Sequence, residues 1–94
     1  MKNLAKVLLS IKVFPSDIAV NLRELKSRIE SNLPTEASIY KFDEEPIAFG
    51  LVALVAHILI PEKGGINTES IEELIKSIDG VSEIQVISTR RISE

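Results

Sequence analysis

Residues able to do acid-base chemistry are few and lie mainly in one short stretch. Asp43, Glu44 and Glu45 are consecutive carboxylates, and Pro46 follows them directly. Such a cluster could supply a general acid and base or hold a cation, but it is also typical of a solvated strand end stopped by a proline. Because no partner base stands at a recognisable spacing, we favour the solvated strand end. We expect no catalytic residue and no enzyme activity.

His57 is the only histidine, and the chain has no cysteine. The missing cysteines exclude disulfides and thiolate chemistry, and one histidine cannot build a zinc site alone. His57 stands in an apolar segment without an acidic or second histidine neighbour at ligand spacing. We interpret it as a packed structural residue, with a surface contact as the alternative. We therefore expect no metal site and no cofactor.

The charge balance points to a protein partner. Fourteen acidic residues outnumber eleven basic ones and give a formal net charge of -3, whereas binding to nucleic acid normally needs a basic stripe. Phosphate-binding glycine motifs are absent, and Lys63-Gly64-Gly65 alone is too short to indicate one. No apolar run approaches the roughly 20 residues that span a bilayer. We expect a cytoplasmic protein that contacts neither nucleic acid nor membrane directly.

One further candidate is an aromatic side chain in a short loop. The stretch from Glu45 to Gly50 reads Glu-Pro-Ile-Ala-Phe-Gly. Pro46 fixes the backbone at the loop entry, and Gly50 allows a turn with positive φ. Phe49 could fold inward as the first core residue, or the loop could hold it out for a partner. Composition alone leaves both readings open.

Three segments are predicted to form strands, and two of them flank this loop. Residues 5–13 alternate apolar and other side chains with a period of two, which is typical of a strand with one buried face. Residues 37–42 predict an edge strand, and their pattern leaves open which face is buried. Residues 51–60 are apolar on both parities, so we expect a strand in the middle of a sheet.

Two segments have the apolar spacing of helices. Residues 22–31 predict a helix that Asn21 caps and Pro34 closes. A second helix begins after a cap at Asn67 or Thr68, and Gly80 is predicted to end it in a left-handed conformation. Glycine suits that conformation because it has no Cβ atom.

The last segment completes the fold. Residues 81–88 predict a strand with Ile84 and Val86 facing inward, and residues 89–94 read as a short tail. The order strand, helix, strand, strand, helix, strand is that of an α+β, ferredoxin-like βαββαβ sandwich. We expect one domain over residues 1–94, with a four-stranded antiparallel sheet and two helices on one of its faces.

The block Glu45-Pro46-Ile47-Ala48-Phe49-Gly50-Leu51, followed by Ala53-Leu54, resembles the signature of the archaeal elongation factor 1-beta family. Weaker points of similarity extend along nearly the whole chain, among them Pro15, Pro34 and Asp79-Gly80-Val81. The resemblance implies a guanine nucleotide exchange domain of translation elongation. Such a domain replaces GDP with GTP on elongation factor 1-alpha, so that this GTPase can rebind aminoacyl-tRNA.

The same resemblance implies where the partner binds. Eukaryotic relatives have a Gly-aromatic-Gly loop whose ring, matching Phe49, packs against the GTPase near its nucleotide site; Ala48 stands in place of the first glycine. They also end in a lysine that reaches the magnesium position, whereas residues 90–94 contain no lysine. We predict that Phe49 is an exposed wedge. The predicted partner-binding residues are Pro46, Ile47, Ala48, Phe49, Gly50, Arg90 and Arg91.

Other functions are compatible with the same fold. A ligand-binding regulatory domain of the ACT type has this order of elements but usually binds its ligand at a glycine-bearing first loop, and residues 14–20 contain no glycine. A structural ribosomal subunit is disfavoured by the low basic content. We also expect an apolar patch on the open sheet face that meets the GTPase or, through self-association, a second copy. Its members would be Leu8, Val55, His57 and Leu59.

Overall fold

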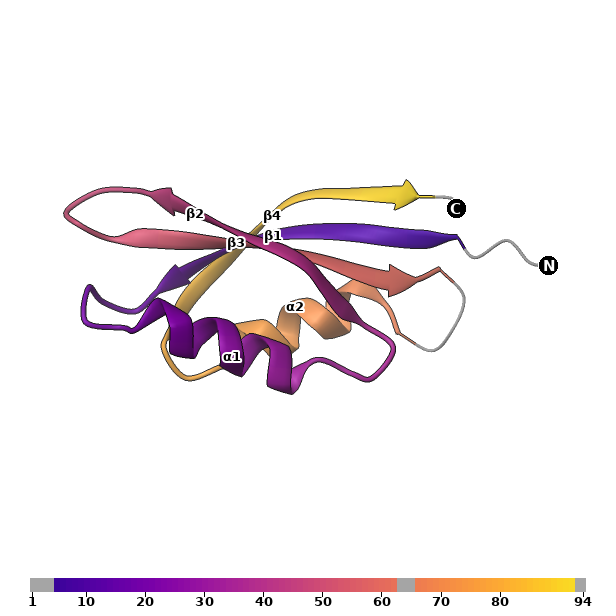
Figure 1. The fold of residues 1–94 in the computed structure, drawn as a ribbon, viewed down its shortest axis with the longest axis horizontal. Helices are drawn as coiled ribbons and strands as arrows, with labels where there is room; N and C mark the ends of the chain where they lie inside the picture. The colour runs from indigo at the N-terminus through magenta and orange to yellow at the C-terminus, as the bar shows by residue number, and fades with distance from the viewer. Residues whose placement is uncertain (1–4, 63–65, 93–94) are drawn as a thin grey trace.

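The computed structural model describes residues 5–62 and 66–92. Its elements in chain order are β1 (Lys6–Pro15), α1 (Leu22–Asn32), β2 (Ser38–Pro46), β3 (Val52–Pro61), α2 (Thr68–Lys76) and β4 (Val81–Ile92). The strands form one sheet in the order β2-β3-β1-β4, and all neighbours are antiparallel. Both helices lie on the same side of this sheet (Figure 1). The ferredoxin-like prediction is confirmed, with β1 and β3 central and β2 at an edge.

The core fills the space between the sheet and the helices. Because β1 and β3 carry apolar side chains on the face that the helices cover, both strands are buried there. Each large aliphatic side chain contributes about 1.5 to 3 kcal/mol by leaving water. The largest fully buried ones are Leu9, Ile11, Val13, Leu25, Ile29, Leu54, Ile58, Ile71 and Ile75.

Side-chain caps fix where the helices begin. Asn21 accepts a hydrogen bond from the backbone N–H of Glu24 at 3.0 Å, as predicted for α1. Of the two caps left open for α2, Asn67 takes the role and accepts from Ser70 N–H at 2.8 Å. The predicted cap at Gly80 is wrong, because α2 already ends at Lys76. Gly80 does have a positive φ of 98°, which it uses in the turn before β4.

A bulge at Tyr40 decides which face of β2 is buried. Ile39 pairs with Ile58 and Lys41 pairs with His57, so Tyr40 is an extra residue in the ladder. One extra residue reverses the alternation of side chains between the two faces. Phe42 consequently packs against the core together with Ile39. The strand continues past its predicted end and carries the whole acidic cluster.

β4 is longer than predicted. Arg90 pairs with Leu8 and Arg91 pairs with Val7, so the predicted tail is wrong as far as Ile92. Polar residues on both faces of this edge strand leave no alternation of apolar and polar side chains to predict it. Ile84 packs against the core as predicted, but Val86 is exposed, because β4 has a sheet neighbour on one side only.

The open sheet face is less exposed than predicted. Leu8 and Val55 are only 8% and 7% exposed, so the expected continuous apolar patch is wrong. Lys12 of β1 pairs in register with Val55 of β3, yet its Nζ lies 3.2 Å from Glu45 of β2. The lysine side chain therefore crosses β3 and covers it, as long charged side chains often do over apolar surface.

The connection between β3 and α2 is described only in part. Pro61 is the last residue of β3, and Lys63, Gly64 and Gly65 lie outside the described residues. Neither helix of residues 5–62 and 66–92 is long and apolar enough to cross a membrane.

Candidate partner-binding site

The loop between β2 and β3 is a tight turn with two residues at positive φ. The backbone N–H of Ile47 donates to Leu51 O at 2.8 Å, and the N–H of Leu51 donates to Ala48 O at 3.0 Å. The two central residues, Phe49 and Gly50, have φ angles of 59° and 78°. Positive φ at both central positions is the mark of a type I′ turn, which normally carries Gly, Asn or Asp there.

Phe49 is therefore an unusual residue in an unusual conformation. It is the one non-glycine residue with positive φ within residues 5–62 and 66–92, and its side chain is 95% exposed. A bulky side chain in this region is a backbone outlier, and such strain is found most often at functional sites. Of the two readings that composition left open, the core reading is excluded, because the ring is in water.

Ion pairs on both faces of β2 hold the strand end that leads into this turn. Lys26 of α1 lies 3.2 Å from Glu44, on the helix side, and Lys12 lies 3.2 Å from Glu45, on the open side. Exposed pairs of this kind contribute little energy singly, about 0.2 to 1 kcal/mol each. The three carboxylate side chains remain 51 to 52% exposed at the end of β2, so the predicted solvated strand end is confirmed. The ion pairs add weak ties between this strand end and its neighbours just before Pro46.

His57 links three strands on the open face. Its Nε2 lies 2.9 Å from Asp43 Oδ2, and its Nδ1 lies 2.8 Å from Ser10 Oγ. Because an ionised carboxylate can only accept, His57 donates from Nε2; in the neutral imidazole the Ser10 hydroxyl then donates to Nδ1. The structural role of His57 is confirmed, and its acidic partner Asp43 comes from the neighbouring strand β2, 14 positions away in the sequence.

This chain of hydrogen bonds has an electrostatic effect and no visible catalytic one. The hydrogen bond from His57 holds the pKa of the Asp43 carboxyl below its usual value, and the nearby charge of Lys41 adds to this effect. Ser10 is buried and its hydroxyl is directed at His57, so it is not placed to attack a substrate. We interpret the chain as a structural link that joins β2 to the centre of the sheet.

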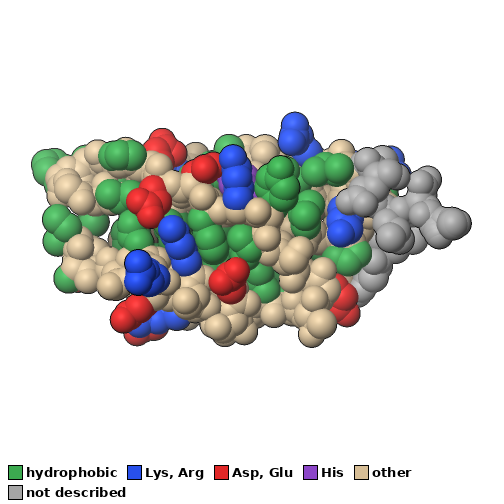
Figure 2. Space-filling model, in the orientation of Figure 1, with side chains coloured by type: hydrophobic (Ala, Val, Ile, Leu, Met, Phe, Trp, Pro, Cys, Tyr) green, Lys and Arg blue, Asp and Glu red, His purple; other side chains and the backbone are tan. Residues whose placement is uncertain are grey.

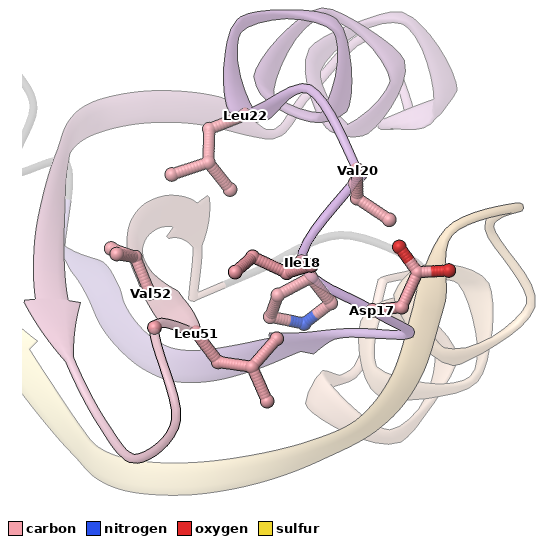
Figure 3. Close-up of a pocket in the computed structure, with 8 residues that line it drawn as sticks. Asp17, Ile18, Val20, Leu22, Leu51 and Val52 are labelled. Carbon is pink, nitrogen blue, oxygen red and sulfur yellow. The ribbon is translucent and has the colours of Figure 1, made fainter.

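A second loop lies beside the Phe49 turn. This is the connection between β1 and α1, and its Ile18 is exposed. Figure 3 shows Ile18 extending over a shallow pocket toward Val52. Sequence reasoning missed Ile18; the available signal was an isolated isoleucine next to Asp17, outside any predicted element. The pocket is lined by Pro15, Asp17, Ile18, Val20, Leu22, Gly50, Leu51 and Val52.

Hydrophobic side chains gather where these two loops meet, at the left end of the molecule in Figure 2. Pro46 to Gly50 are all part of this end. Arg90 and Arg91 lie near the C-terminal end of β4, beside the N-terminal part of β1 and at the opposite end of the molecule (Figure 1). Arg91 Nε also lies 2.8 Å from Glu62 Oε2. The structure thus divides the predicted binding residues between opposite ends of the sheet.

Known proteins are similar to this chain in sequence or in fold. Elongation factor 1-beta of Hyperthermus butylicus is 44% identical over 97% of this chain and 99% of its own length. The protein of that name from Staphylothermus marinus is 43% identical over 96% of this chain and all of its own length. The C-terminal domain of the MgtC protein from Mycobacterium tuberculosis has a similar fold, with a TM-score of 0.52 and 13% identity over 97% of this chain and 88% of that one.

The model of one protein family also matches the chain. It describes the EF-1 guanine nucleotide exchange domain and matches residues 8–92, which include β3, β4, the Phe49 turn and most of β1. This match favours the exchange-domain reading over the ACT-type alternative. The chain belongs to the family of EF-1 guanine nucleotide exchange domains, and its role is nucleotide exchange in translation elongation.

Proposed function

We propose that this chain promotes the release of GDP from elongation factor 1-alpha, so that GTP can replace it, and that Phe49 is the side chain that inserts into the GTPase. Residues 1–94 act as one exchange domain in the cytoplasm. They bring about a change in affinity and no bond-making step, and they need no cofactor and no direct contact with nucleic acid.

Exchange of this kind requires a differential affinity. The factor must bind the nucleotide-free GTPase more tightly than the loaded form, and by reciprocity it then weakens nucleotide binding by the same factor. A difference of about 4 kcal/mol corresponds to roughly a thousandfold change in affinity. Desolvated aromatic side chains supply interface energy on this scale more readily than other residues do.

The single observation that carries the proposal is the exposure of Phe49 together with its positive φ. A ring that is 95% exposed, on a backbone at positive φ, has no structural reason to be phenylalanine. The neighbours in the turn supply its geometry, since Ala48 and Leu51 close it with a hydrogen bond of 3.0 Å. A rigid mount lowers the entropy lost on binding.

Arg90 and Arg91 fit a second contact. Arg90 pairs with Leu8, and the Phe49 turn ends where β3 begins at Val52. The path along the sheet from Leu8 to Val13, and from its partner Leu54 to Val52, is about 23 Å at roughly 3.3 Å per residue. The two arginines therefore meet a different region of the GTPase from the one that Phe49 enters. Their charge suits an acidic, magnesium-holding surface, and exposed charges of this kind act mainly on the rate of association.

The test is the release of a fluorescent GDP analogue from purified elongation factor 1-alpha. The wild-type domain should accelerate release, and Phe49→Ala should remove most of that acceleration while its unfolding free energy stays within about 1 kcal/mol of wild type. Tyr40→Ala is the matched control, because Tyr40 is an aromatic residue that is 63% exposed but lies at the β2 bulge. Full activity of Phe49→Ala would reject the proposed role of Phe49.

A further inference from the structure

Two loops that are distant in sequence lie side by side, and each exposes a large apolar side chain. Ile18 is 68% exposed and Phe49 is 95% exposed, the two highest values among the large hydrophobic residues that the structure describes. A Cβ atom placed on Gly50 would lie 2.8 Å from Ile18 Cδ1. The isoleucine side chain therefore lies directly against the backbone of the Phe49 turn.

The position of Ile18 is fixed by its own loop. Asp17 Oδ1 accepts from the backbone N–H of Ala19 at 2.6 Å, and Asp17 O accepts from Val20 N–H at 3.2 Å. The loop is tied to the turn before β4 by a hydrogen bond of 2.8 Å from Ser16 N–H to Gly80 O. A local turn of this type orients the side chain at its tip. Ile18 is thus held out by defined hydrogen bonds.

We infer that Ile18 is a second contact residue for elongation factor 1-alpha, and that Ile18 and Phe49 form one apolar surface that binds an apolar region of the GTPase. The inference rests on the proposed function. Ile18 lies against Gly50, which directly follows Phe49 in the turn and also lines the pocket that Ile18 covers. A partner that buries the Phe49 ring should also meet Ile18, because Ile18 lies against the residue next to Phe49 in the turn.

Substitutions at Ile18 distinguish contact with the GTPase from structural support of the Phe49 turn. Ile18→Ala removes the apolar contact, and Ile18→Lys keeps an aliphatic stem that can cover Gly50 but brings a charge to the contact. The measured quantity is the dependence of GDP release on exchange-factor concentration. We expect Ile18→Ala to lower the apparent second-order rate constant about fivefold or more, and Ile18→Lys to lower it further.

Ile87 provides a control of the same residue type. It is 51% exposed and lies at the irregular register of β4, away from both loops. Ile87→Ala and Ile87→Lys should exchange within about twofold of wild type. Urea unfolding of all four variants checks that each is folded, and each should stay close to wild type because both isoleucines are largely in water.

The outcomes distinguish this inference from the proposed function. Loss of exchange in Phe49→Ala together with wild-type exchange in both Ile18 variants would overturn the inference and leave the proposed function standing. Wild-type exchange in Ile18→Lys with impaired Ile18→Ala would assign Ile18 to loop support and would also overturn it. If the wild-type domain does not accelerate GDP release at all, the proposed function is wrong and the inference with it.

Discussion

Replacing Phe49 with Asn should stabilise the domain while it abolishes exchange. The ring is 95% exposed, so its removal gives up almost no buried area. The backbone at φ 59° favours Asn over Phe, since an L-residue pays about 1 to 2 kcal/mol in the left-handed region and Asn recovers part of it through local hydrogen bonds. A net gain of about 0.5 to 1 kcal/mol is therefore expected.

That gain is measurable. In a domain of this size, 1 kcal/mol shifts the melting temperature by about 4 to 8 °C. Thermal and urea unfolding of Phe49→Asn should both move toward higher stability, whereas Phe49→Ala should change little because alanine suffers the same strain. Phe42→Ala is the matched contrast, since Phe42 packs against the core, and it should lose about 2 to 4 kcal/mol.

The sign of the effect is decisive. A loss of more than about 1 kcal/mol in Phe49→Asn would mean that the ring packs against the protein, and the assignment of Phe49 as a strained contact residue would be wrong. A stable Phe49→Asn that still accelerates GDP release would leave the turn intact but refute its role in exchange.

Three further predictions concern the surroundings of this turn and the other end of the sheet. Gly50→Ala puts a Cβ on a backbone with a positive φ of 78°, so urea unfolding should show a loss of about 1 to 2 kcal/mol. Exchange should also fall, because the new methyl group would lie 2.8 Å from Ile18 Cδ1 and displace the end of that side chain. Unchanged stability would contradict the left-handed backbone at Gly50. Replacing Arg90 and Arg91 together with Ala should slow exchange and flatten its dependence on salt, and a variant whose kinetics match those of wild type at both low and high salt would reject the second contact. The pKa of Asp43 is lowered in the fold, so its ionised carboxyl stabilises the domain at pH values above the ordinary pKa of 3.8, and this contribution is lost as the pH falls through the lowered pKa. Urea unfolding at a series of pH values should show the stability difference between wild type and Asp43→Asn shrinking as the pH falls below 3.8. A difference that stays constant with pH would refute the link to His57.

Sequence periodicity was sufficient for the elements whose burial is regular. The apolar alternation around Leu9 and Ile11 and the two-sided apolar run of β3 predict their central places correctly, because burial on a sheet face imposes a period of two. β4 fails this test: an edge strand with one neighbour has no buried face along much of its length, so residues as far as Ile92 read as a tail.

Contacts that depend on register could not be predicted in the same way. The His57–Asp43 hydrogen bond exists because the bulge at Tyr40 moves Asp43 to the open face, and no local pattern announces that extra residue. Ile18 was missed for a related reason. Its neighbour Gly50 comes from a loop beyond two other elements, so only the tertiary structure brings them together.

The same contacts explain how a strained aromatic can persist in a small domain. The turn itself prefers Gly, Asn or Asp, so the fold must hold it from outside. Lys12 and Lys26 fix the end of β2 on both faces, and Ile18 covers Gly50. Each tie is weak by itself, but together they support the backbone of the turn before the partner arrives. Binding energy from Phe49 then need not order the loop, and more of it remains to discriminate the nucleotide-free GTPase from the loaded one.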